Sequence, residues 1–83
     1  MQNYKVIAYY QSAREHLIED GKGNRFRVDL FVDASFNSVL YSDENTIQEI
    51  IEIERNLVGK KLSIKKLSML HPVYFAEQVS ITQ

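Results

Sequence analysis

The stretch DENTIQEIIEIERNLVGKKLSIKK, residues 43–66, decides the fold. Aliphatic residues recur every three or four positions between 47 and 58, which predicts a helix with one apolar face. Gly59 follows where a glycine typically ends a helix. Beyond it, Leu62 and Ile64 alternate with polar residues, as in a half-buried strand. We therefore expect a helix over about 43–58, capped by Ser42, Asp43 or Asn45, and then a strand.

Charge changes sign in the middle of this stretch. The acidic residues Asp43, Glu44, Glu49, Glu52 and Glu54 precede Arg55, and no basic residue lies among them. From Arg55 to Lys66 every charged residue is basic. Such a change predicts a small domain whose two sides have electrostatic potentials of opposite sign.

Strand patterns precede the helix. Residues 4–11 are rich in β-branched and aromatic side chains, and 16–19 are expected to continue the same strand after a bulge. The turn sequence Asp20-Gly21-Lys22-Gly23 predicts a hairpin. In 24–33, Phe26, Val28, Leu30 and Val32 alternate with polar residues, which places Phe31 on the polar face.

A short strand over 38–41 and a last strand containing Val73, Phe75, Val79 and Ile81 complete the pattern. The expected order is β-β-β-α-β-β, in a mainly β or α+β fold with five antiparallel strands. An OB-like small barrel has this order of elements. An open sheet with one helix across it has the same order, so both architectures stay open.

Composition limits the class of protein. The 83 residues, with a net charge of −1, predict a single small domain over 1–83. The chain has no cysteine, and no apolar run approaches the roughly 20 residues of a membrane span. We expect a cytoplasmic protein without a membrane partner. Small domains bury little surface, so a homodimer is also expected, with Tyr10, Phe36 and Leu40 as its candidate patch.

The sequence carries no catalytic signature, so we expect a binding protein and not an enzyme. His16 and His71 lie in no metal-ligand motif, and no phosphate-binding loop or nucleophile elbow is present. No metal and no cofactor are therefore predicted.

Single-stranded nucleic acid is the first predicted partner. Such binding needs aromatic rings that stack on bases and cations that follow the phosphates. Aromatic residues on strand faces that look exposed are expected to stack on bases: Tyr9, Phe31 and Tyr74. Basic residues of the strands and of the segment after the helix are expected to contact phosphates: Lys5, Arg25, Arg27, Lys60, Lys61, Lys65 and Lys66.

A basic protein is the alternative partner. The acidic helix residues Glu44, Glu49, Glu52 and Glu54 could occupy a basic groove, for instance on an enzyme that acts on nucleic acid. In general character only, a compact, cysteine-free chain with an acidic helix is similar to the small inhibitors of phages and mobile elements. On this hypothesis the protein is an inhibitor or adaptor that binds a host protein.

Overall fold

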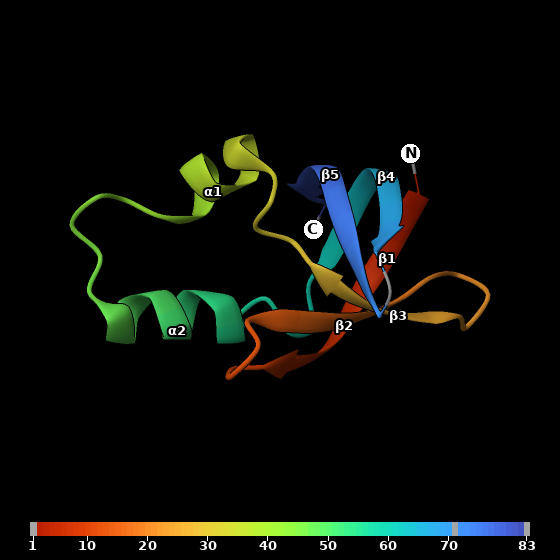
Figure 1. Ribbon diagram of the computed structural model, residues 1–83, viewed down its shortest axis with the longest axis horizontal. Coiled ribbons are helices and arrows are strands. Elements are labelled where there is room, and N and C mark those ends of the chain that lie inside the picture. Colours follow the sequence, from red (N-terminus) through yellow and green to blue (C-terminus); the bar gives the residue numbers. More distant parts are fainter. Residues whose placement is uncertain (1, 71, 83) are drawn as a thin grey trace.

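The strands form a closed barrel in the order β1-β2-β3-β5-β4 in the computed structural model, which describes residues 2–70 and 72–82 (Figure 1). The strands are β1 (Gln2–Tyr10), β2 (Glu15–Glu19), β3 (Arg25–Asp29), β4 (Lys61–Leu70) and β5 (Val73–Ile81). The helices α1 (Ala34–Leu40) and α2 (Ile47–Arg55) stand between β3 and β4. The mainly β, OB-like barrel is confirmed, and the open sheet is not found.

The single bent strand predicted over 4–19 is wrong. Residues 2–10 and 15–19 form two strands, β1 and β2, which pair antiparallel with each other. Arg14 has a positive φ of 53° at the turn between them. The hairpin predicted at 20–23 is confirmed, because β2 and β3 pair on either side of it and Gly23 takes the positive φ that the turn needs.

The strand predicted over 38–41 is also wrong, because these residues belong to α1 and its C-terminal cap. Asp33 starts the helix, since its carboxylate accepts hydrogen bonds from the backbone N–H groups of Ser35 and Phe36 at 2.9 and 3.3 Å. Its other oxygen accepts one from Val79 of β5 at 2.9 Å. The fold therefore has two helices where one was expected.

The second helix, α2, is shorter than predicted and begins later. Thr46, not Asn45, is its N-terminal cap, and it forms a capping box with Glu49 through hydrogen bonds of 3.2 and 2.8 Å. The side chain of Asn45 instead accepts a hydrogen bond from Ser42. Gly59, with a φ of 91°, turns the chain into β4.

Two seams close the barrel. At one seam β1 pairs antiparallel with β4, from Gln2 opposite Ile64 to Lys5 opposite Lys61. At the other, β3 pairs with β5 through two residue pairs only, Val28–Tyr74 and Asp29–Phe75. This second pairing is parallel, which corrects the expectation of a fully antiparallel sheet.

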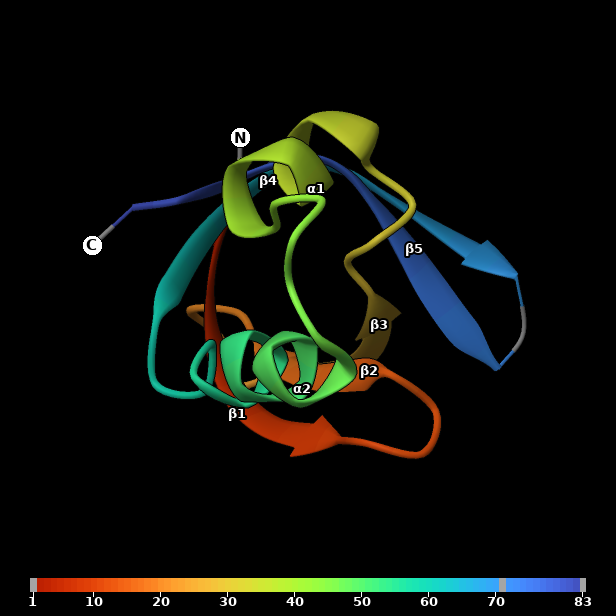
Figure 2. The same cartoon turned by 90° about the vertical axis from the view of Figure 1, so that its left-hand side faces the viewer.

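The core fills the barrel and is sealed at one end by the helices. Strand residues of the interior, such as Ile18, Val28 and Leu62, are fully buried. Seen from the helical end, α1 and α2 lie across the mouth of the barrel (Figure 2). Phe36 of α1 and Leu57 after α2 are each 2% exposed and complete the core there. Phe36 is thus unavailable for the dimer patch expected from the sequence.

We predict that Asp33→Ala lowers the free energy of unfolding by about 1–2 kcal/mol, because α1 loses its cap and the N–H of Val79 loses its partner. Urea unfolding followed by circular dichroism measures this. Asp43→Ala, in the exposed connection between the helices, is the matched control and should change stability by less than about 0.5 kcal/mol. Equal losses in the two variants would contradict the capping role.

Candidate functional site

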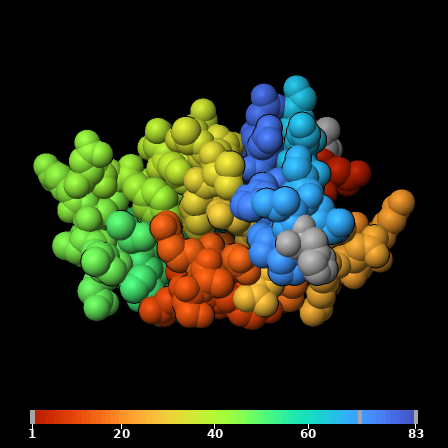
Figure 3. Space-filling model, viewed as in Figure 1, coloured from red at the N-terminus to blue at the C-terminus, as the bar shows by residue number. Residues whose placement is uncertain are grey.

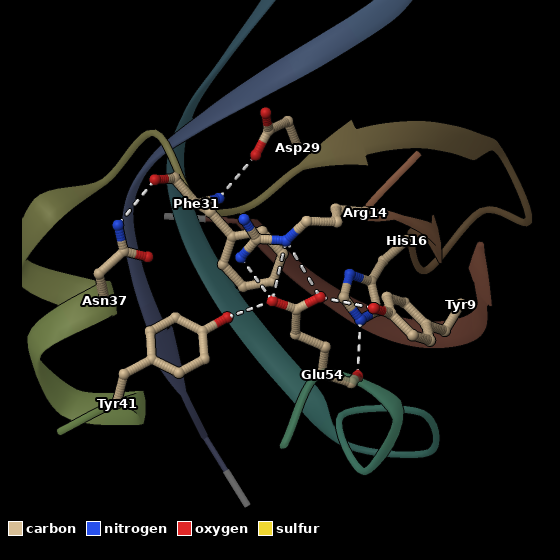
Figure 4. Close-up of polar contacts among 8 residues, drawn as sticks. All are labelled: Tyr9, Arg14, His16, Asp29, Phe31, Asn37, Tyr41 and Glu54. Carbon is tan, nitrogen blue, oxygen red and sulfur yellow. Dashed lines mark hydrogen bonds and ion pairs between the residues drawn. The ribbon is translucent and has the colours of Figure 1, made fainter. Parts of the chain in front are cut away.

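A buried carboxylate, that of Glu54, joins α2 to the barrel (Figure 4). Oε1 accepts a hydrogen bond from the Tyr9 hydroxyl at 2.5 Å, and Oε2 accepts one from the Tyr41 hydroxyl at 2.7 Å. The guanidinium of Arg14 forms an ion pair with Oε2 at 2.6 Å. Glu54 itself is 1% exposed. The four side chains come from β1, the β1–β2 turn, the end of α1 and α2, so one carboxylate holds four parts of the chain together.

Glu54 is predicted from the sequence to contact a basic partner together with Glu44, Glu49 and Glu52, and its burial shows that this prediction is wrong for Glu54. At about 100° per residue, Glu54 lies about 140° from Glu49 and about 160° from Glu52 around the helix. It falls within the arc of Ile47, Ile50 and Ile51 instead. A helical projection of the sequence therefore contains the signal for a buried acid, which then requires a cationic partner.

Aromatic rings surround this ion pair. The guanidinium carbon of Arg14 lies 5.1 Å from the centroid of the Phe31 ring. Tyr9 stacks on His16 with centroids 4.7 Å apart, and Phe31 meets His16 edge-on at 5.8 Å. Phe31 is half-buried and packs against the core, and Tyr9 is half-buried beside Glu54. The structure therefore holds Tyr9 and Phe31 in the interior cluster and away from the outer sheet face.

Hydrogen bonding sets the protonation of this cluster. Burial by itself raises the pKa of Glu54, but the hydrogen bonds from Arg14, Tyr9 and Tyr41 outweigh it, so the net shift is downward. Burial and the bond to Glu54 raise the pKa of Tyr9 to about 12 and raise that of Tyr41 as well. Both oxygens of Glu54 are occupied by donors, so this carboxylate is built to hold structure and not to transfer protons.

His16 is fully buried beneath the cluster. Its Nε2 lies 2.8 Å from the backbone oxygen of Glu54, and because a carbonyl can only accept, Nε2 carries the proton. Nδ1 is buried without a partner among the described residues. Protonation of Nδ1 would bury an unpaired charge, and burial accordingly lowers the pKa of His16.

A pocket of about 540 Å³ opens beside the ion pair. Tyr9 and Arg14 line it on the barrel side, together with the turn residues Gln11 and Ser12. The isoleucines of α2 line the other side: Ile47, Ile50 and Ile51. Ile47 is 77% exposed at its rim. The pocket is therefore an apolar groove with one half-exposed cation.

A basic row crosses the outside of the barrel. Lys61 of β4 is opposite Lys5 of β1, Lys5 is opposite Glu19 of β2, and Glu19 is opposite Arg25 of β3. The row thus spans four adjacent strands, about 14 Å at a strand spacing of about 4.8 Å. The predicted phosphate-contacting residues Lys5, Arg25 and Lys61 are brought together here. Glu19 pairs with Arg25 at 2.8 Å within the row.

An aromatic and cationic platform lies on the same outer face. The guanidinium carbon of Arg27 is 3.9 Å from the centroid of the Tyr10 ring, and Arg27 also pairs with Glu15 at 2.9 Å. Leu17 of β2 is opposite both Ala8 and Arg27, so it separates the platform from the row. Tyr9 is the residue of this strand that the sequence predicts to stack on bases. Side-chain alternation instead gives the outer position to Tyr10.

The other predicted residues lie elsewhere. Lys60 adjoins the row, just before β4, whereas the exposed Lys65 and Lys66 lie farther along β4, toward its hairpin with β5. Tyr74 is half-buried, packs against the core and meets Phe26 edge-on at 5.2 Å. Three of the four acids of the alternative site are exposed at the helical end: Glu44, Glu49 and Glu52.

The chain matches no protein-family model, no curated protein and no solved structure. Within residues 2–70 and 72–82, no group of three or more acidic or histidine side chains is arranged to hold a metal ion. Neither helix of this part has the length and apolarity that crossing a membrane requires. His71, which the sequence analysis considered as a metal ligand and set aside, lies outside the described residues.

We predict that Glu54→Ala lowers the free energy of unfolding by about 3 kcal/mol. This is the lower end of the range for breaking a buried ion pair, because Arg14 is half-exposed and water can stabilise its charge. Chemical denaturation measures the loss. Glu52→Ala is the control, since its exposed pair with Arg55 should contribute at most about 0.5 kcal/mol. Similar losses for both variants would show that the Glu54 cluster does not hold the fold.

We predict that the free energy of unfolding falls in two steps as the pH is lowered. His16 and Glu54 both have lowered pKa values in the folded state, so below the ordinary values of 6.5 and 4.5 the unfolded chain binds more protons than the folded one. The free energy of unfolding should first decline below pH 6.5 and then more steeply below 4.5. Urea titrations across this range measure it. His16→Asn should remove the first decline only, and its persistence would contradict the assignment to His16.

Proposed function

We propose that the protein binds single-stranded nucleic acid across the outer face of β1, β2 and β3. The observation that carries the proposal is the combined geometry of that face, where the row of Lys61, Lys5 and Arg25 lies beside the Tyr10–Arg27 platform. In OB-like barrels, the face of strands 2 and 3 is the one that binds oligonucleotides. Cations that follow a backbone and a ring that can stack on bases are what such binding needs.

The pairing of two lysines supports an anionic partner. Lys5 and Lys61 are directly opposite on neighbouring strands, and like charges in this position destabilise a sheet. No carboxylate forms an ion pair with either lysine among the described residues. A phosphate group between them would relieve the repulsion. We therefore expect the two lysines to contact phosphate.

The acids on this face do not prevent binding. Glu19 and Glu15 pair with Arg25 and Arg27, whose side chains are 56% and 45% exposed. Exposed ion pairs contribute about 0–1 kcal/mol, so a phosphate can replace either carboxylate at little cost. The acids are expected to favour an open single strand of low charge density over a duplex.

Anisotropy of a labelled oligothymidine tests the proposal. If three or four phosphates are neutralised, a plot of log affinity against log salt concentration should have a slope of about −2 to −3. Arg27→Ala, which removes the platform's cation, should weaken binding by about 0.5–2 kcal/mol. Arg55→Ala removes an exposed arginine from α2, outside the proposed face, and should change affinity by less than twofold or so. Absence of saturable binding at low salt would overturn the proposal.

A protein partner at the helical end is the second candidate. Residues 28–54 contain seven acids and no lysine, arginine or histidine. Val39 and Ile47 are 76% and 77% exposed on the helices of the same stretch. Apolar side chains rimmed by acids favour a basic, partly apolar protein surface, in keeping with an inhibitor or adaptor in the cytoplasm. Glu44, Glu49 and Glu52 remain its proposed contacts, without Glu54. Loss of such an interaction in Ile47→Lys, with oligothymidine binding intact, would separate the two candidates.

A further inference from the structure

The free edge of β4 is the surface that the fold leaves without a partner. β4 pairs with β5 from Leu62 to Leu70 but with β1 only from Lys61 to Ile64. Within the described residues, nothing else pairs with the segment 65–70. Along this segment the strand presents unpaired N–H and C=O groups, which can accept another strand.

Apolar side chains lie at the end of this edge. Met69 is 61% exposed and Leu70 is 69% exposed, although both are strand residues. The β4–β5 hairpin, in blue, stands at the surface of the barrel, while the helices, in green, lie at the opposite end (Figure 3). Tyr10 and Leu40, which the sequence analysis proposed as a dimer patch, are half-buried, so this edge is the better apolar surface for a second copy.

We propose that a second copy of the chain pairs with this edge, β4 against β4, antiparallel and about a two-fold axis through Ser68. A two-fold axis perpendicular to the sheet keeps each residue and its symmetry mate on the same face of the sheet. Because residues directly opposite each other on neighbouring strands also share a face, one residue must lie opposite its own symmetry mate. With Ser68 in that position, Met69 is opposite the partner's Leu67, and Leu70 is opposite the partner's Lys66. Each exposed apolar side chain then covers an apolar or aliphatic neighbour.

The lysines exclude the registers that are centred on them and are far apart in the register through Ser68. In it, Lys66 and the partner's Lys66 are four residues apart along the strands, about 14 Å, which exceeds the Debye length of about 8 Å at physiological salt. A register centred on Lys65 or Lys66 would place equal charges directly opposite, which is destabilising. Lysine on an edge commonly prevents strand pairing, but here it excludes only the pairings that place two lysines directly opposite.

The interface is small, so the dimer should be weak. The free edge of six residues is about 20 Å long, and only two large apolar side chains per copy are covered. A contact this short is expected to bury less than the roughly 1,200–2,000 Å² of a stable complex, so we expect dimerisation only at high protein concentration. The row crosses β4, β1, β2 and β3, but its residue on β4, Lys61, lies outside the free segment 65–70. We therefore expect the dimer to leave the row and the platform accessible to nucleic acid.

Sedimentation equilibrium over a concentration series tests the dimer. The wild-type protein should change from monomer to dimer mass as the concentration rises, and Met69→Lys should stay monomeric. Ile47→Lys is the matched control, because Ile47 is 77% exposed at the opposite end of the molecule, and it should behave as the wild type. A monomeric wild type at all concentrations, or dissociation by Ile47→Lys alone, would overturn the proposal.

A cysteine at the axis tests the register. The chain has no cysteine, so Ser68→Cys introduces one thiol per copy. Cβ atoms of directly opposite residues lie about 4.5–5.5 Å apart, close to what a disulfide needs. Oxidised glutathione should then convert most of the protein to a covalent dimer, whereas Ser38→Cys on the exposed face of α1 should give little. Equal cross-linking of the two variants would show random collision and contradict the register.

Discussion

The buried carboxylate of Glu54 is the constraint on which the other features of the helical end depend. It is 1% exposed, and water cannot stabilise its charge, so Arg14 and two tyrosine hydroxyls must do so. Arg14 can reach it only because the β1–β2 turn bends with a positive φ at that residue. Tyr41 can reach it only because α1 ends where it does. One ionised group thereby fixes the position of both helices on the barrel.

The cluster also divides the molecule into two regions of different character. The segment 28–54, which includes both helices, carries seven acids and the most exposed aliphatic residues, Val39 and Ile47, whereas the basic row lies on the strands. The fold keeps these charges apart, because α1 and α2 sit across one mouth of the barrel and the row crosses its wall. The two candidate functions therefore use different surfaces, and a strand of nucleic acid on the row need not approach Glu44, Glu49 or Glu52 of the helical end.

Local sequence patterns predicted what local interactions decide. The turn at 20–23, the presence of α2 and the chain reversal at Gly59 were predictable because each depends on neighbours in the chain. The predicted β-β-β-α-β-β order lacks α1 and assigns its first and third strands wrongly. The residues 38–41 were assigned to the wrong element because α1 begins at Asp33, which is tied to Val79, 46 residues away. For the same reason Arg14 was missed, since its partner Glu54 lies 40 residues away. Tyr9 and Tyr10 differ only in which face each occupies, and a bulge in β1 decides that.

The pairing of β1 with β4 has a consequence for how the chain is made. Residues 2–5 leave the ribosome well before their partners on β4, residues 61–64. The edge of β1 that faces β4 must therefore stay unpaired until the segment that forms β4 has been synthesised. Contacts between such distant segments slow folding and expose strand edges to other chains in the meantime. The polar composition of this first segment, with Gln2, Asn3 and Lys5 around the buried Tyr4, is suited to that delay.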